Sequence, residues 1–231
     1  MDGLASIART RWRRVSRLID TATRAVESSI AHHSTATNIP MVTYQFIAPR
    51  GADLLRLRIP FPLTWRAERG SLRVLKSDTD RSFGQRGSFF VPTEELFDSH
   101  IQADAYGGAS GHLVIATDVA CAATECEPDW HALRLAYARG SRGFGLALAQ
   151  SMFMHPGYAW DIHAVVSHLD ASLKGVQTAL FRDAYSYDAT LRRCRRLHDM
   201  FDRGHAGCHF MRVTPMRNAA PITTNIEKTH A

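Results

Sequence analysis

The sequence predicts an α/β fold in which a mixed, mostly antiparallel sheet is flanked by helices and preceded by a helical extension. β-rich runs bounded by Gly, Pro and Asp fill the second quarter of the chain, and helical and β-rich patterns alternate in the second half. A basic amphipathic pattern covers residues 4–32. We therefore expect an N-terminal helix and linker over residues 1–38, an α/β domain over 39–214 and a flexible tail over 215–231.

The composition and charge of the chain indicate which partners it could bind. The chain has 231 residues, 45% of them hydrophobic, and a formal net charge of +6. Of its 28 basic residues only Lys76, Lys174 and Lys228 are lysines, so arginine carries the charge. Arginine pairs well with phosphates, which makes nucleic acid a possible partner through an arginine-rich surface. A GC-rich genome produces the same bias without any such function.

The predicted N-terminal helix over residues 4–32 has apolar residues at three- and four-residue steps and arginines on its other face. Such a helix can meet a membrane surface, nucleic acid or a partner protein, or dock on its own domain. No apolar run approaches the ~18 to 20 residues needed to span a bilayer, and the start lacks the apolar core of a signal peptide. We expect a cytoplasmic protein without a membrane span.

The four cysteines favour reduced thiols over a metal site. Cys121 and Cys126, and then Cys194 and Cys208, have spacings that differ from those of short zinc knuckles. Three histidines accompany the second pair, so a Cys/His site stays conceivable, but we assign no metal ligand. These histidines are His198, His205 and His209.

The first half of the α/β domain reads as strands separated by turn residues. The expected strands are 41–47, 54–59, 72–75 and 88–91. The polar, glycine-bearing stretch 66–86 indicates a mobile loop, and Thr93 is expected to cap a short helix. Gly107 to Gly111 indicates a flexible joint.

In the second half of the domain, hydrophobic patterns with the period of a helix alternate with patterns typical of a strand. A strand over 112–119 comes first, and residues 131–138 read as a strand, although a helix capped by Asp129 and running to Arg139 fits the periodicity almost as well. The remaining expected elements are a helix over 143–154, a strand over 161–167, a helix over 171–182, an extended piece over 185–187, a basic helix over 191–201 and a strand over 209–214.

The stretch from Arg139 to Ala147 is rich in glycine and positive charge, and a predicted helix follows it. Because a helix N-terminus presents unpaired N–H groups and partial positive charge, the junction is a candidate phosphate site. Glycine-rich junctions also occur as plain tight turns.

The run Arg142-Gly143-Phe144-Gly145-Leu146-Ala147 fits the Q/R-x-x-G-x-G/A signature of the GNAT-type N-acyltransferase superfamily. Over residues 111–214 the chain resembles that family in its order of elements. The lead-in departs from the family at Tyr137 and Arg139, and the family's usual Asn is absent near Asp170. The resemblance implies a GNAT-like sheet and the transfer of an acyl group from acetyl-CoA or another acyl-CoA to an amine acceptor by direct attack.

The resemblance also implies roles for individual residues. The family's cofactor site would correspond here to Leu135, Tyr137, Arg139, Arg142, Gly143, Phe144, Gly145, Leu146 and Ala147. His131 and Asp118 are the candidate bases for the incoming amine, and Tyr185 is the candidate acid for the leaving thiolate. His163 and His168 lie on or beside the expected strand 161–167.

Two other functions stay open. The loop Ser141 to Gly145 also resembles the glycine-rich loop of RNA-binding RAMP-type CRISPR proteins, a reading that requires a helix over 129–139 and a strand over 145–153. The basic run Arg192 to Arg196 suits that reading. The third possibility is a non-enzymatic interaction protein on a degenerate acyltransferase fold.

Overall fold

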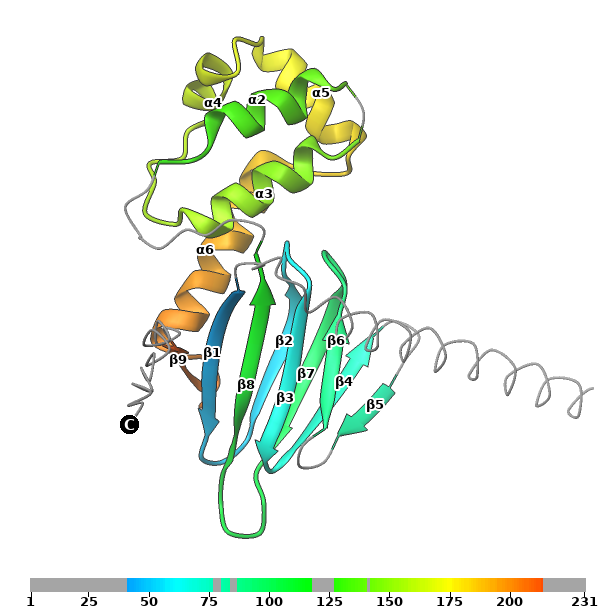
Figure 1. Ribbon diagram of the computed structural model, residues 1–231, viewed down its shortest axis with the longest axis vertical. Helices are drawn as coiled ribbons and strands as arrows, with labels where there is room; N and C mark the ends of the chain where they lie inside the picture. The colour runs from blue at the N-terminus through cyan, green and yellow to red at the C-terminus, as the bar shows by residue number, and fades with distance from the viewer. Residues whose placement is uncertain (1–40, 77–79, 84–86, 118–126, 141, 214–231) are drawn as a thin grey trace, which may run out of the picture. The chain divides into compact units, whose positions relative to one another are not determined.

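The computed structural model describes residues 41–76, 80–83, 87–117, 127–140 and 142–213 (Figure 1). The strands are β1 (Met41–Ala48), β2 (Ala52–Arg58), β3 (Leu63–Arg69), β4 (Ser71–Lys76), β5 (Asp80–Phe83), β6 (Ser88–Val91), β7 (Leu96–Gln102), β8 (Ala109–Ala116) and β9 (His209–Val213). The helices are α2 (Trp130–Ala138), α3 (Phe144–Met154), α4 (Ile162–His168), α5 (Leu173–Arg182) and α6 (Tyr187–Arg203). The predictions for residues 4–32, Asp118, the first two cysteines and the tail lie outside the described residues.

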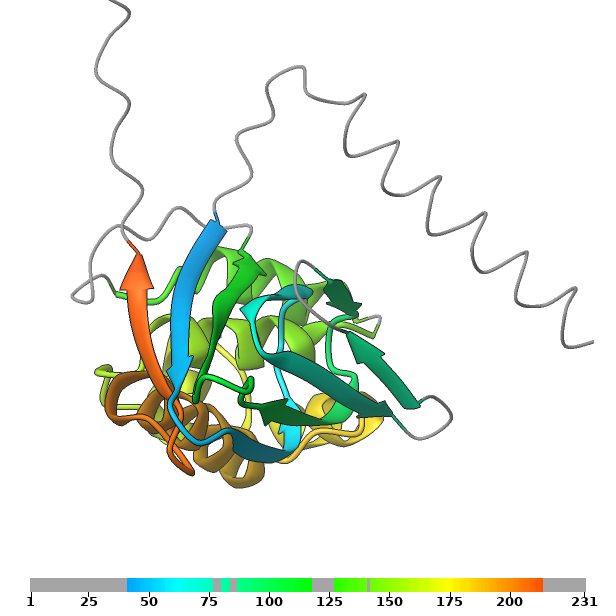
Figure 2. The same cartoon turned by 90° about the horizontal axis from the view of Figure 1, so that it is seen from below.

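The strands form two antiparallel sheets that pack as a sandwich. One sheet has the order β6-β3-β8-β1-β9 and the other the order β2-β7-β4-β5. Figure 2 shows β9, β1 and β8 side by side, as their pairing requires. The indole of Trp65 on β3 meets the ring of Phe97 on β7 edge-on, with centroids 6.4 Å apart, so aromatic side chains join the two sheets. Both residues are fully buried.

The predicted strands at 41–47, 54–59, 72–75, 88–91, 112–119 and 209–214 are found as β1, β2, β4, β6, β8 and β9. Their side chains alternate between buried and accessible, as a two-residue period requires; in β8 the alternation is complete. The coarse prediction of a mixed α/β protein with antiparallel sheets and flanking helices is therefore confirmed.

The predicted loop over 66–86 is wrong, because β3, β4 and β5 occupy it. Arg66 and Glu68 face outward while Trp65 and Ala67 are buried, so the charges belong to the outer face of a strand rather than to a loop. The expected helix after Thr93 is a turn in which Glu94 has a φ of 63° and its N–H donates to the Ile59 carbonyl. β7 follows at once.

Two segments predicted as strands are helices. Residues 131–138 lie in α2, which takes the alternative that the sequence left open, because the Asp129 carboxylate accepts the Ala132 N–H at 2.9 Å. Residues 161–167 lie in α4, where the Asp161 carboxylate accepts two N–H groups of the first turn. Ile162, Val165 and Val166 follow the helical spacing i, i+3, i+4, and the acidic cap agrees with it.

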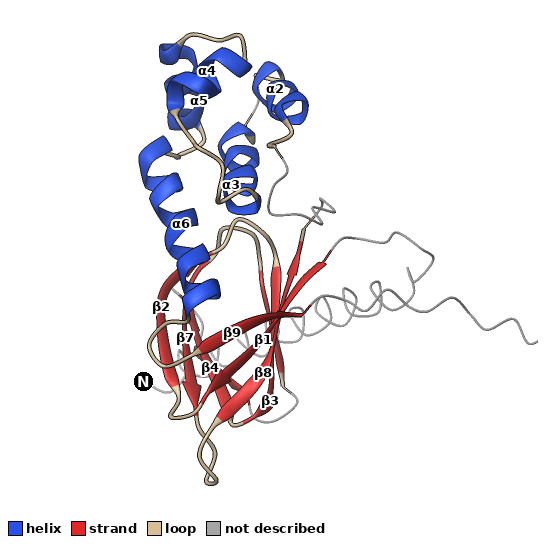
Figure 3. Cartoon of the chain, turned by 90° about the vertical axis from the view of Figure 1, so that its left-hand side faces the viewer, coloured by secondary structure: helices blue, strands red, loops and turns tan. Residues whose placement is uncertain are grey.

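The predicted helices 143–154, 171–182 and 191–201 are found as α3, α5 and α6, and residues 185–187 form the approach to α6. Figure 3 shows the helices grouped beyond one end of the strands. The rings of Phe61 and Phe153 lie 5.8 Å apart and join α3 to the sandwich. At the far end of α6 the ring of Phe201 stacks on Tyr44 of β1 at 4.6 Å. Among the described residues no helix has the length and apolar character that a bilayer crossing requires.

Candidate functional site

The glycine junction holds one of the chain's own carboxylates. The helix begins at Phe144 as expected, but the N–H groups of Gly143 and Gly145 both donate to Oδ2 of Asp183, at 2.9 and 2.8 Å. The Asp183 side chain is 3% exposed. The predicted phosphate position at this helix N-terminus is therefore filled by Asp183, the residue that ends α5.

The structure does not arrange the other predicted site residues as a GNAT site. Leu135, Tyr137 and His131 lie on the helix α2, and Arg139 ends it. Leu146 and Ala147 are half-buried on α3, while Arg142 is exposed. Tyr185 follows α5, beside Arg193, and burial raises its pKa to about 12.

A pair of short helices, α4 and α5, gives this part of the chain a recognisable shape. α4 has 7 residues, α5 has 10, and Leu169 to Ser172 join them. Two helices joined by a three- or four-residue turn form the helix-turn-helix arrangement. The prediction from sequence lacks this helix pair, because it places a strand over residues 161–167.

The turn between α4 and α5 is held by the backbone. The N–H of Ala171 donates to the Val166 carbonyl at 3.1 Å and that of Asp170 to the Ser167 carbonyl at 3.2 Å. This is a Schellman arrangement, and it requires the left-handed conformation that Asp170 adopts, with a φ of 51°. Ser172 then caps α5 by accepting the Gly175 N–H at 3.0 Å.

α5 has two distinct faces. Val176, Ala179 and Leu180 are buried in the core. The exposed residues follow the spacing i, i+3, i+4, i+7 and so form one face. This recognition face consists of Lys174, Gln177, Thr178 and Phe181. Phe181 is 84% exposed.

Neighbouring elements fix the helix pair. On α2, the Arg134 guanidinium donates to the His168 carbonyl at the end of α4, at 2.9 Å. The Arg182 guanidinium donates to the Gly140 carbonyl at 2.6 Å, so the α2–α3 loop lies against the end of α5. A groove of about 520 Å³ runs between α2 and α5. Arg139 and Arg142 of the same loop are exposed.

α5 ends as α4 does, but with a residue less suited to the conformation. Ala184 has a φ of 61°, and the Tyr185 N–H donates to the Leu180 carbonyl at 2.9 Å. Because a left-handed alanine costs about 1 kcal/mol relative to glycine, we expect Ala184→Gly to raise the free energy of unfolding by about 1 kcal/mol. Urea denaturation measures the change. An equal or lower stability would contradict this assignment of strain.

Cys194 and Cys208 are buried free thiols. Burial raises the pKa of each to about 12 from an ordinary value of 9.0. Among the residues that the structure describes, no group of three His, Cys, Asp or Glu side chains could hold a metal ion.

We expect both thiols to resist alkylation in the folded protein at pH 8, because the reactive thiolate is not formed there. Since the unfolded chain ionises these groups first, the stability that they contribute is lost as the pH rises above about 9 towards 12. Peptide mass spectrometry after iodoacetamide treatment, native and denatured, measures the protection. Labelling of Cys194 in the native protein at the denatured rate would contradict its burial.

The solved structures that this chain is similar to match only part of it. No protein-family model and no curated protein matches the chain. Part of it is similar to a cupin superfamily protein from Desulfitobacterium hafniense, with 10% identity, a TM-score of 0.30 and coverage of 35% of this chain and 71% of that chain. The cupin domain of Schizosaccharomyces pombe Cnp3 matches with 15% identity, a TM-score of 0.31 and coverage of 36% and 57%. An RmlC-like cupin from Shewanella frigidimarina matches with 14% identity, a TM-score of 0.30 and coverage of 34% and 68%.

The GNAT resemblance is wrong. The two strands that the resemblance places on either side of the glycine junction are the helices α2 and α4. Acyl transfer from CoA to an amine, with His131, Asp118 and Tyr185 in catalytic roles, rested on that resemblance and falls with it. The degenerate acyltransferase falls for the same reason. The RAMP-type interpretation needs a strand over 145–153, where α3 lies.

Proposed function

We propose that the chain binds double-stranded DNA through the helix pair α4 and α5, with α5 in the major groove. The observation that carries the proposal is the exposed face of α5, which is polar, basic and aromatic while its opposite face is locked into the core. In helix-turn-helix proteins the second helix lies in the major groove and its N-terminal residues contact base edges. In this chain Lys174 and Gln177 occupy those positions.

The side chains of the recognition face match the chemistry of base edges. A glutamine pairs with adenine through two hydrogen bonds, and a lysine donates to the O6 and N7 acceptors of guanine. An exposed aromatic ring can cover the methyl group of thymine. Gln177, Lys174 and Phe181 supply these three contacts from one helix face.

Phosphate contacts come from the edge of the same surface. Arg139 and Arg142 are exposed in the loop that Arg182 fastens to α5. On this proposal these exposed arginines neutralise backbone phosphates and set the orientation of the protein without reading sequence. The net charge of +6 favours the same partner.

The proposal is tested by selection from a pool of random-sequence DNA duplexes with the full chain. We expect an enriched motif that binds about a thousandfold more tightly than a shuffled duplex, and an affinity that falls as the salt concentration rises. Fluorescence anisotropy measures both. Enrichment of no motif, with equal affinity for all duplexes, would remove the proposal.

A further inference from the structure

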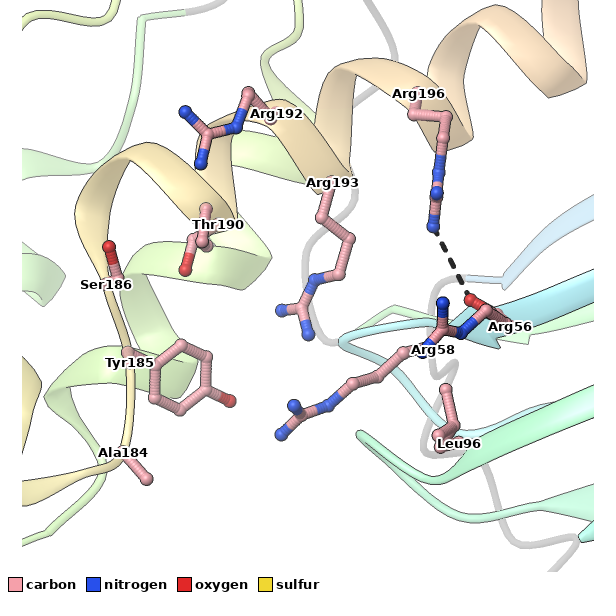
Figure 4. A pocket seen from close by; sticks show the side chains of 11 residues that line it. Arg56, Arg58, Leu96, Ala184, Tyr185, Ser186, Thr190, Arg192, Arg193 and Arg196 are labelled. Carbon is pink, nitrogen blue, oxygen red and sulfur yellow. Dashed lines mark hydrogen bonds between the residues drawn. The ribbon is translucent and has the colours of Figure 1, made fainter.

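A second basic site lies at the junction between the sandwich and the helices, away from the recognition face. It is a cavity of about 620 Å³, which is within the size range of small-ligand sites. Five arginines line it, together with Tyr185, Ser186, Thr190 and three apolar residues (Figure 4). We call this cavity the arginine pocket. Its arginines are Arg56, Arg58, Arg192, Arg193 and Arg196.

One carboxylate organises the floor of the arginine pocket. Glu94 accepts from both terminal nitrogens of Arg193 at 2.7 Å and lies 2.6 Å from Nε of Arg58. Both Arg193 and Glu94 have side chains less than 15% exposed. Figure 4 shows the guanidinium groups of Arg58 and Arg193 pointing toward Tyr185. Two arginines are thus held in fixed positions by one negative charge.

The other three arginines concentrate positive charge. Among the residues that the structure describes, no carboxylate pairs with the guanidinium groups of Arg56, Arg192 and Arg196. Arg192 and Arg196 are four residues apart on α6, where like charges repel. Arg196 reaches across to the Arg56 carbonyl at 3.5 Å, so β2 and α6 bring the charges together from opposite walls.

The backbone is distorted where Arg56 enters the arginine pocket. The pairing of β2 with β7 shifts between Leu54 and Leu57, and Arg56 there has a φ of 56°. The Asp98 carboxylate holds this bulge by accepting the Arg56 N–H at 2.6 Å. Bulges re-aim side chains beside functional sites, and a left-handed non-glycine residue is strained. The strained residue, Arg56, is therefore one of the five arginines that line the arginine pocket.

The opposite wall contains the start of α6. Ser186 caps this helix without a side-chain hydrogen bond, so the first N–H groups of α6 keep their partial positive charge. The helix has 17 residues. Asp188 in the first turn offsets part of the charge of the helix terminus, and the guanidinium groups and hydroxyl groups along the cavity favour negative charge.

We propose that the arginine pocket binds a small organic anion that carries two or more carboxylate or phosphate groups. Guanidinium groups bind both kinds of oxyanion through paired hydrogen bonds, and the apolar wall of Leu96, Ala184 and Ala189 covers the carbon part. The site lies where the strands meet the helices and has the volume of a small-molecule site, which fits a small anion better than the backbone of a duplex.

Isothermal titration of the full chain tests the site, with citrate and pyrophosphate as probes and NaCl adjusted to equal ionic strength. We expect saturable one-to-one binding of at least one probe, which separates the carboxylate from the phosphate chemistry. The double variant Arg192→Gln/Arg196→Gln should weaken that binding at least tenfold. Arg195→Gln, a neighbouring exposed arginine outside the pocket, should change it less than twofold.

Three outcomes would overturn the proposal. The first is that neither probe gives saturable binding. The second is that the double variant binds a probe as tightly as the original protein does. The third is that Arg195→Gln weakens binding as much as the double variant does. Thermal unfolding without any probe serves as the control for folding. All three substituted arginines are exposed, so we expect the melting temperatures to agree within about 2 °C.

Discussion

Replacing Asp183 with alanine is expected to lower the free energy of unfolding by about 3 kcal/mol. The substitution removes the acceptor of two N–H groups, those of Gly143 and Gly145, at distances of 2.9 and 2.8 Å. A buried donor left without its partner costs about 1–3 kcal/mol. The carboxylate also opposes the positive end of α3, and that interaction is lost as well. Urea denaturation measures the change.

The matched substitution Asp183→Asn keeps an acceptor oxygen of the same shape and removes only the charge. We expect it to cost about 1 kcal/mol or less, because both N–H groups can still donate to the amide oxygen. Asp199→Ala, at a side chain that is 66% exposed, should change stability by less than about 0.5 kcal/mol. Equal losses for alanine and asparagine at position 183 would show that charge, rather than the paired N–H groups, stabilises the junction.

The second large effect concerns the recognition face. On a duplex selected by the original protein, Gln177→Ala is expected to lower affinity between about tenfold and a hundredfold and to relax the preference at one base pair. Lys174→Ala should lower affinity for the same duplex by a similar factor and relax the preference at the guanine that Lys174 contacts. Fluorescence anisotropy at several salt concentrations measures both.

Arg203→Ala is the matched control for these variants. Its side chain is 83% exposed at the end of α6 and lies off the recognition face, so affinity should stay within twofold. If Gln177→Ala bound every duplex as the original protein does, α5 would not be the reading helix. An equal loss of affinity for Arg203→Ala would show that binding depends on overall positive charge and not on the recognition face.

The sandwich was predictable from sequence where burial alternates over a whole strand. β1 and β8 pair through eight residues each; β1 was predicted at nearly its observed bounds, whereas β8 begins at Ala109, three residues before its predicted start. β3 was lost because its outward residues, Arg66 and Glu68, are charged. A strand at the surface of a sandwich alternates core residues with charges, and a short stretch of it reads as a polar loop.

The helix pair was harder to predict, since α4 is short and apolar. Its 7 residues give a short pattern, in which the i, i+3, i+4 spacing of Ile162, Val165 and Val166 and the cap at Asp161 were the signals for a helix. In α2 the cap at Asp129 likewise favours a helix, although the sequence leaves both a helix and a strand open for residues 131–138. Acidic N-caps were the available signal for both helices.

The contacts that define the two sites could not be predicted from one sequence. Asp183 meets the glycine junction from 40 residues away, and Arg196 meets Arg56 from 140 residues away. The sequence singled out the glycine junction for its electropositive helix start. It offered no way to see that a carboxylate of the same chain, following a distant helix, already satisfies that charge.

Methylation protection on a selected duplex tests most directly whether α5 enters the major groove. Dimethyl sulfate methylates guanine at N7, an acceptor in the major groove, and adenine at N3 in the minor groove. We predict protection of N7 at guanines within the selected motif, and loss of that protection with Lys174→Ala at the guanine that Lys174 contacts. Protection confined to adenine N3, or none at all on a tightly bound duplex, would contradict the account.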